Sequence, residues 1–225
     1  MFKQINYVKS KLDNIENYFL KKLMLFRIRK NKNNPKSQKT EIYEDENFIT
    51  QWGEGTAWHE LKYLFANLEG KVLDIACGAG QCIQFLNYNN KIEVYGCDFS
   101  ETLINVAIKN GISKNKLLVC DATDLKYSNN EFEYSYSVGS LEHFTIDQID
   151  LFISESKRVT KNTTFHHIPI SKDKNFGWIE LSQAYYLNSE KWWLEKFGKH
   201  YQKIFTLESN WKDPLSKGLW IICKK

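Results

Sequence analysis

The sequence predicts an α/β protein built on a mainly parallel sheet with helices on both faces. Three observations support this prediction. Short apolar and β-branched runs alternate with helical patterns between residues 70 and 170, three of these runs place an aspartate at or near their end, and glycines follow the first. Such alternation is typical of right-handed βαβ units, whose crossover helices cover both faces of a parallel sheet.

The first 40 residues differ from the rest of the chain in charge and pattern. They carry eleven lysine or arginine residues and two acids, although the whole chain has a net charge of only +4, so the body is acidic. Apolar residues recur every three or four positions from Ile5 to Phe26, which predicts a basic amphipathic helix, and "RKNKNNPKSQKT" predicts a linker. We therefore divide the chain into an extension, residues 1–40, and a domain, residues 41–225.

The role of this extension has two interpretations. A basic amphipathic helix can lie on an anionic membrane surface or bind a protein partner. It can equally pack on its own domain or on a second copy of the chain, which leaves monomer and dimer both open.

The domain begins with a helical pattern at residues 56–68. The pattern that follows predicts strands at 71–75, 92–97, 117–120, 132–138 and 163–170, with helices at 81–88, 100–109 and 146–159 between them. A further helix is expected in "NSEKWWLEKFG", where a serine can cap the start and a glycine the end. Strands at 201–207 and 219–224 then predict a closing antiparallel hairpin.

Composition and cysteine content restrict the class of protein. With 42% hydrophobic residues the chain is typical of a globular domain, and its five widely spaced cysteines form neither a CxxC pair nor a metal-ligand set. We expect reduced thiols, no metal site and a cytoplasmic location. A membrane span needs about 18 to 20 uninterrupted apolar residues, and lysines break the best candidate, "YFLKKLMLFRIRK".

The stretch "VLDIACGAG" places Asp74 at the end of a buried strand, followed by Gly78 and Gly80. Ligands of doubly wound sheets bind at this end of the strands, where glycines let the backbone approach them. A dinucleotide loop needs a third glycine, but Ile83 stands three residues after Gly80, so a nicotinamide-dependent oxidoreductase is the weaker interpretation. A buried carboxylate also needs a partner to offset its desolvation, such as a positively charged ligand.

Three motifs in order, "LDIACGAG", "VYGCDFS" and "VCDATDL", resemble the class I S-adenosylmethionine-dependent methyltransferases over residues 70–170. The resemblance implies a Rossmann-like seven-stranded sheet with a final antiparallel strand. It also implies S-adenosylmethionine as the cofactor and S-adenosylhomocysteine as the product.

The same resemblance implies roles for individual residues. Asp74 is expected near the amino-acid moiety of the cofactor and Asp98 at its ribose hydroxyls, while Asp121 and the N–H of Ala122 face the adenine. Asp98 and Asp121 could instead serve only as helix-start and turn residues. The other expected cofactor contacts are Ala76, which replaces a glycine frequent in the family, Gly78, Gly80, Phe99 and Ser137.

Methyl transfer to a hydroxyl requires a group that takes the hydroxyl proton, and histidine suits this role near pH 7. "SVGSLEHF" places His143 beside the expected methyl position, where it could be this base or orient the loop. His166 and His59 are the other catalytic candidates. The residues expected to contact the acceptor are His143, His167, Tyr185, Tyr186 and Trp58, whereas Trp192 and Trp193 are expected in the core.

The acceptor is expected to be a small molecule. Nucleic acid is disfavoured because the body is acidic and the motifs of base methyltransferases are absent. The segment from "VGSLEHF" to "NSEKWWLEKF" resembles methyltransferases of bacterial capsule and O-antigen gene clusters, which implies a carbohydrate-linked acceptor: a sugar hydroxyl, or a sugar-linked phosphoramidate or phosphate. Two alternatives stay open: a non-catalytic cofactor-binding subunit of a biosynthetic assembly, and an N-methyltransferase of a small metabolite.

Overall fold

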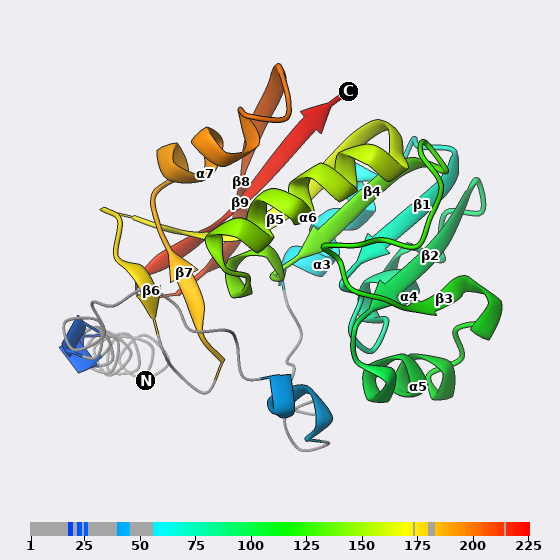
Figure 1. Ribbon diagram of the computed structural model, residues 1–225, viewed down its shortest axis with the longest axis horizontal. Helices are drawn as coiled ribbons and strands as arrows, with labels where there is room; N and C mark the ends of the chain where they lie inside the picture. Colours follow the sequence, from blue (N-terminus) through cyan, green and yellow to red (C-terminus); the bar gives the residue numbers. More distant parts are fainter. Residues whose placement is uncertain are drawn as a thin grey trace, which may run out of the picture.

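A computed structural model describes residues 18, 19, 22, 23, 25, 26, 40–45, 56–172, 174–179, 183–213 and 215–225. In this part of the chain, seven strands form one sheet in the order β3-β2-β1-β4-β5-β9-β8 (Figure 1). β9 is antiparallel to both of its neighbours, and the five strands from β3 to β5 are parallel. The strands are β1 (Gly70–Ile75), β2 (Ile92–Asp98), β3 (Leu117–Val119), β4 (Phe132–Val138), β5 (Thr160–Ser171), β8 (Lys203–Lys212) and β9 (Ser216–Lys224).

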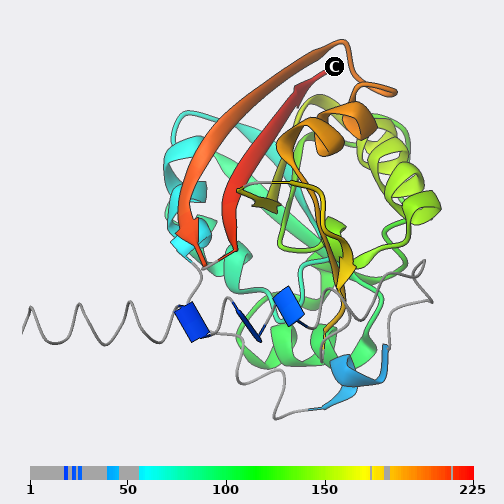
Figure 2. The same cartoon turned by 90° about the vertical axis from the view of Figure 1, so that its left-hand side faces the viewer.

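Helices cover both faces of this sheet. Figure 2 shows the segment of α3 on one side of the curved β8–β9 pair and α6 with α7 on the other. Because successive side chains of a strand point to opposite faces, Val72 of β1 joins the core under α3, α4 and α5, whereas Leu73 and Ile75 join the core under α6 and α7. The helices are α3 (Thr56–Leu64), α4 (Gln81–Leu86), α5 (Glu101–Lys109), α6 (Ile146–Val159) and α7 (Glu190–Phe197).

Short elements complete the domain. The 3₁₀ turns are η1 (Thr40–Glu44), η2 (Lys114–Lys116) and η3 (Leu141–His143). A separate two-stranded sheet, which the sequence did not predict, pairs β6 (Gly177–Ile179) with β7 (Tyr185–Leu187) in antiparallel register. It lies between β5 and α7 in the chain, and its β7 packs against η3.

The predicted fold class is confirmed, and α6 and β4 have the predicted bounds. The capping box of Thr145 and Gln148 fixes the start of α6, because each side chain accepts a hydrogen bond from the other residue's backbone N–H. The first helix ends at Leu64 rather than at residue 68. There the Asn89 side chain donates hydrogen bonds to the carbonyls of Phe65 and Leu68, so a distant residue satisfies the end of this segment.

Most of the predicted N-terminal extension lies outside the described residues. The residues described between 18 and 26 are helical, and Leu25 packs against a small apolar cluster of Ile179, Leu187 and Leu215. Tyr18, Phe19, Leu23 and Phe26 are at least half exposed. In the part of the chain that the structure covers, no helix has the length and apolar character needed to cross a membrane.

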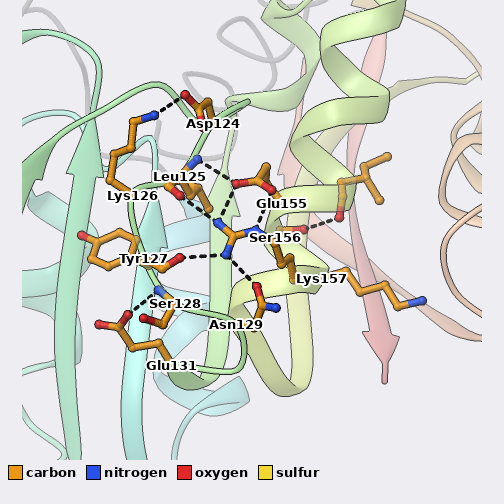
Figure 3. Close-up of polar contacts among 12 residues, drawn as sticks. Asp124, Leu125, Lys126, Tyr127, Ser128, Asn129, Glu131, Glu155, Ser156 and Lys157 are labelled. Carbon is orange, nitrogen blue, oxygen red and sulfur yellow. Dashed lines mark hydrogen bonds and ion pairs between the residues drawn. The ribbon is translucent and has the colours of Figure 1, made fainter.

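Arg158, at the end of α6, forms hydrogen bonds that hold the loop after β3 in place. Its guanidinium donates to the carbonyls of Leu125 (2.8 Å) and Tyr127 (2.7 Å) and to the Asn129 side chain (2.9 Å). It also forms a two-pronged ion pair with Glu155, whose carboxylate accepts the Leu125 N–H as well. Figure 3 shows these loop residues gathered beside Glu155. The loop begins at the carboxyl end of β3, so this cluster holds one wall of the site described below.

We expect Arg158→Ala to destabilise the domain by about 2 kcal/mol, because it removes several hydrogen bonds from a charged donor and leaves loop carbonyls without a partner. Urea unfolding of the full chain measures this loss. Lys161→Ala is the control, because Lys161 is exposed and its contact with Glu133 is 4.0 Å long, so its loss should cost less than about 0.5 kcal/mol. Equal losses in the two variants would contradict the role given to Arg158.

Candidate active site

A cavity of about 710 Å³ opens at the carboxyl ends of the parallel strands. Its walls come from the segments that follow β1 to β5, together with α3, η1, β7 and the β8–β9 turn. The predicted site residues that line it are Trp58, Asp74, Ala76, Gly78, Asp98, Phe99, Asp121, Ala122, His143 and Tyr185. The predicted residues that do not line it are His59, Gly80, Ser137, His166, His167 and Tyr186.

Asp98 ties the loop after β1 to the end of β2. Its Oδ2 accepts the Gly78 N–H (2.9 Å) and its Oδ1 accepts the Ser100 N–H (3.0 Å). The side chain is buried, and burial raises the pKa of its carboxyl, although these backbone donors oppose the shift. Each oxygen can accept a further hydrogen bond from a ligand hydroxyl, because a carboxylate offers about four acceptor positions.

The glycine loop has unusual backbone geometry. Ala76, Gly78 and Gly80 all have positive φ angles, of 60°, 53° and 80°. Such angles favour glycine, which explains why glycine is frequent at the position that Ala76 occupies in this chain. Gly80 does not face the cavity: a Cβ there would lie 2.1 Å from Cδ1 of Ile112. Gly80 therefore allows the start of α4 to pack against the segment after α5.

Asp74 lies deeper in the same wall. It is buried, and its Oδ2 accepts a hydrogen bond of 3.0 Å from the Tyr136 hydroxyl of the neighbouring strand β4. Burial raises the pKa of this carboxyl well above its ordinary value, and the nearby Asp98 charge adds to the rise. A cationic group of a ligand would reverse this shift by pairing with the charged form. Sequence reasoning missed Tyr136, which stands 62 residues away in the chain.

Asp121 and Ala122 form the wall at the end of β3. Oδ1 of Asp121 accepts hydrogen bonds from both the N–H and the hydroxyl of Thr123, each 2.8 Å long, so this carboxylate also forms a turn. Its side chain is exposed, whereas Ala122 is buried. Both of these hydrogen bonds use Oδ1, so Oδ2 of Asp121 has no hydrogen-bond partner among the described residues.

His143 lies in η3, immediately after β4. Its Nδ1 lies 2.7 Å from the carbonyl of Ala184, which requires a proton on that nitrogen and leaves Nε2 as an acceptor in the neutral ring. Burial lowers its pKa to about 4, so the ring is neutral at pH 7. The neighbouring Glu142 is 4% exposed, lines the cavity, and places Oε1 3.8 Å from Nε2 of His143.

The other histidines are placed differently. His166 is fully buried on β5, where its Nδ1 lies 2.9 Å from the Ser137 hydroxyl and its ring packs beside Phe152 and Phe197. His167 faces the opposite side of the sheet, beside Trp220. His59 is exposed on α3, with its ring edge against Phe85. Burial lowers the pKa of both His166 and His167, to about 3 and about 4.

The aromatic residues after β5 divide between core and cavity. Tyr185 lines the cavity, and its ring lies 6.4 Å from that of His143. Tyr186 turns the other way and stacks on Trp192, while Trp193 is fully buried in the core, as expected. Residues that line the cavity without having been predicted include Tyr43, Gln183, Trp211 and Asp213. They come from η1, from the segment before β7, from the end of β8 and from the β8–β9 turn, where no local sequence signal points to a ligand.

No cluster of three or more potential metal ligands occurs among the residues that the structure describes. The acids of the cavity are separated along the ends of different strands.

Comparison with known proteins agrees with this arrangement. Residues 72–163 match the family model described as a methyltransferase domain. The chain is 30% identical over 77 residues to "Probable tRNA methyltransferase 9B" of Bos taurus, a match that covers 34% of this chain and 16% of that protein. It is 29% identical over 101 residues to phosphoethanolamine N-methyltransferase 3 of Arabidopsis thaliana, covering 44% of this chain and 21% of that protein.

Among solved structures, the fold resembles 1,6-didemethyltoxoflavin-N1-methyltransferase of Burkholderia thailandensis, solved with bound 1,6-didemethyltoxoflavin and S-adenosylhomocysteine. The TM-score is 0.65 and the sequence identity is 13%, over 82% of this chain and 84% of that one. The architecture is thus the Rossmann-like class I methyltransferase fold. The match to a methyltransferase domain confirms the predicted cofactor, S-adenosylmethionine. The chain spans less than a quarter of the length of the two curated relatives, so their substrates do not transfer to it directly.

We expect Gly80→Ala to destabilise the domain more than Gly111→Ala. Both glycines have positive φ, so alanine costs about 1 kcal/mol of backbone strain at each. Only at position 80 does the new methyl group overlap a neighbour, Ile112, which should add about 1 to 3 kcal/mol; at position 111 it meets nothing within 4 Å. Thermal and urea unfolding measure both variants, and equal losses would refute the packing role of Gly80.

Proposed function

We propose that this protein binds S-adenosylmethionine in the cavity and transfers its methyl group to a small acceptor. The support comes from the three acids at the ends of β1, β2 and β3, which line one continuous wall beside the loop at Gly78. Asp98 carries the proposal furthest, because it is already positioned by two backbone N–H groups and still has acceptor capacity toward the cavity.

The ammonium, the ribose and the adenine of the cofactor each have a chemical counterpart in this wall. Asp74 would pair with the ammonium of the amino-acid moiety, which offsets the cost of burying that carboxylate. Asp98 would accept hydrogen bonds from the ribose hydroxyls. Asp121 and the N–H of Ala122 would contact the adenine, and Phe99 would lie beside it. The arrangement leaves the segment after β4, with Glu142 and His143, on the acceptor side of the cavity.

When bound, S-adenosylmethionine supplies an electrophilic methyl carbon, and its sulfur keeps the bonding electron pair as S-adenosylhomocysteine forms. The chain must hold the acceptor in line with that carbon and take up the acceptor's proton. Of the three candidate bases, only His143 lines the cavity. We therefore assign the hydroxyl proton to Nε2 of His143. His166 and His59 receive no role in proton transfer.

We propose that the acceptor is an oxygen atom of a carbohydrate-linked molecule. We also propose that the protein acts in the cytoplasm. Tyr185 and Trp58 would contact the acceptor, because aromatic walls suit the apolar face of a sugar ring. N-methylation of a small metabolite is a second candidate, which the similarity to a phosphoethanolamine N-methyltransferase favours. A non-catalytic cofactor-binding subunit is the remaining alternative, and absence of methyl transfer in a chain that binds the cofactor would support it.

Asp98→Ala should weaken binding of S-adenosylhomocysteine by about 1.5 to 3 kcal/mol, or roughly 10- to 150-fold, because hydrogen bonds to a charged acceptor are lost. Titration calorimetry on the full chain measures the affinity. Glu93→Ala is the matched control, since Glu93 is an exposed acid on the same strand, and it should bind as the wild type does. A folded Asp98→Ala protein with unchanged affinity would rule out the ribose assignment.

His143→Gln should lower kcat about 100-fold, the loss typical of removing a general base, while affinity for S-adenosylhomocysteine stays within about twofold. The assay follows labelled methyl transfer to a panel of sugars, amino sugars and sugar phosphates. His59→Gln is the contrasting variant, and its rate should match the wild type. Retention of full activity by His143→Gln, or a loss confined to His59→Gln, would be incompatible with the assignment.

A further inference from the structure

The cavity has an unbalanced set of charges. Its described lining residues include no lysine or arginine but five carboxyl groups, which are Asp74, Asp98, Asp121, Glu142 and Asp213. The first three belong to the proposed cofactor wall. Glu142 and Asp213 lie on the acceptor side, beyond the ends of β4 and β8.

The two acids on the acceptor side differ in what they already bind. Oδ1 of Asp213 accepts the N–H groups of Leu215 (2.7 Å) and Ser216 (2.6 Å), and its Oδ2 accepts the Ser216 hydroxyl. This carboxylate therefore builds the turn between β8 and β9. Oε2 of Glu142, in contrast, is buried with no hydrogen-bond partner among the described residues. A buried polar atom without a hydrogen-bond partner costs folding free energy, and a ligand that donates to it would offset this cost.

Glu142 and His143 both present hydrogen-bond acceptors to such a ligand. In its ionised form the Glu142 carboxylate only accepts hydrogen bonds, and Nε2 of His143 also accepts, because the ring proton is on Nδ1 and faces the Ala184 carbonyl. The other carboxylate oxygen of Glu142, Oε1, lies 3.8 Å from Nε2 of His143. A ligand with two donor groups on neighbouring atoms can satisfy both acceptors at this spacing. Because one acceptor is an acid, a positively charged donor suits it best.

We propose that Glu142 and His143 form a subsite for an amino alcohol, such as the neighbouring amine and hydroxyl of an amino sugar. Glu142 binds the protonated amine, and Nε2 of His143 faces the hydroxyl. The inference rests on the proposed function and narrows its acceptor class, since a sugar phosphate entering the same cavity would meet carboxylates and no described cation. Burial raises the pKa of Glu142 to about 8, and a bound ammonium would lower this pKa by stabilising the charged form.

The test compares three sugars that differ mainly in charge: D-glucosamine, D-glucose and D-glucose 6-phosphate. Each is titrated by calorimetry into the full chain saturated with S-adenosylhomocysteine. We expect D-glucosamine to bind at least tenfold more tightly than D-glucose, and D-glucose 6-phosphate to bind more weakly than either. Equal affinities, no binding by any of the three, or tightest binding of the phosphate would overturn the proposal.

Glu142→Gln keeps the size of the side chain and removes its charge. It should reduce the preference for D-glucosamine over D-glucose to about twofold or less. Glu101→Gln, an exposed acid at the start of α5, is the control and should keep the full preference. Retention of the preference by Glu142→Gln would also overturn the subsite. Binding of S-adenosylhomocysteine distinguishes failure of the proposed function from failure of the subsite. If the wild-type protein does not bind S-adenosylhomocysteine, the proposed function is wrong. If it binds S-adenosylhomocysteine but shows no preference for D-glucosamine, only the subsite is wrong.

Discussion

The site depends on the two hydrogen bonds that Asp98 accepts from backbone N–H groups. One comes from Gly78 in the loop after β1, and the other from Ser100 at the start of α5. A single carboxylate thereby joins two loops that leave adjacent parallel strands, and it fixes the distance between the wall at Gly78 and the end of β2. Because Asp98 is buried, its desolvation must be offset, and these donors do part of that. The remaining acceptor capacity points to a ligand.

The same principle applies along the whole edge of the sheet. Parallel strands bring their carboxyl ends to one side, so acids that are 20 or more residues apart in sequence become neighbours in space. Asp74 is held by Tyr136, Asp121 by its own turn, and Asp213 by the β8–β9 turn. These partners position the carboxylates without neutralising them. The cavity consequently favours ligands with positive charge or with many donor groups, and S-adenosylmethionine, with its sulfonium and ammonium, has both.

The sequence was most informative where local signals determine structure. The helix at 146–159 was predicted with its observed bounds because its residue pattern is local, and the capping box that the structure shows at Thr145 is a local signal for the same start. The strand pattern, the glycine loop and the closing hairpin were predicted for the same reason. Of the expected cofactor contacts, those at the strand ends line the cavity, but Gly80 and Ser137 do not.

The parts that could not be predicted depend on tertiary contacts. The strands of the β6–β7 pair are three residues long, which is too short for a periodic sequence pattern. A side-chain contact supports the pair, because Asn188 accepts a hydrogen bond from the Gly177 N–H. The histidines of "TTFHHIPI" were recognisable as candidates, but only the packed structure separates the deeply buried His166 from the cavity. Likewise, nothing in "LEH" shows that Oε2 of Glu142 is buried without a partner, because this depends on the tertiary packing around it.

The central claim is that acids at three strand ends bind the adenosyl and amino-acid groups that S-adenosylmethionine and S-adenosylhomocysteine share. A crystal structure of the full chain with S-adenosylhomocysteine tests it most directly. We predict density across the Gly78 loop, with the ribose hydroxyls within hydrogen-bonding distance of Asp98 and the adenine beside Ala122. A cavity that stays empty at saturating ligand, or a nucleoside bound away from Asp98, would contradict the account.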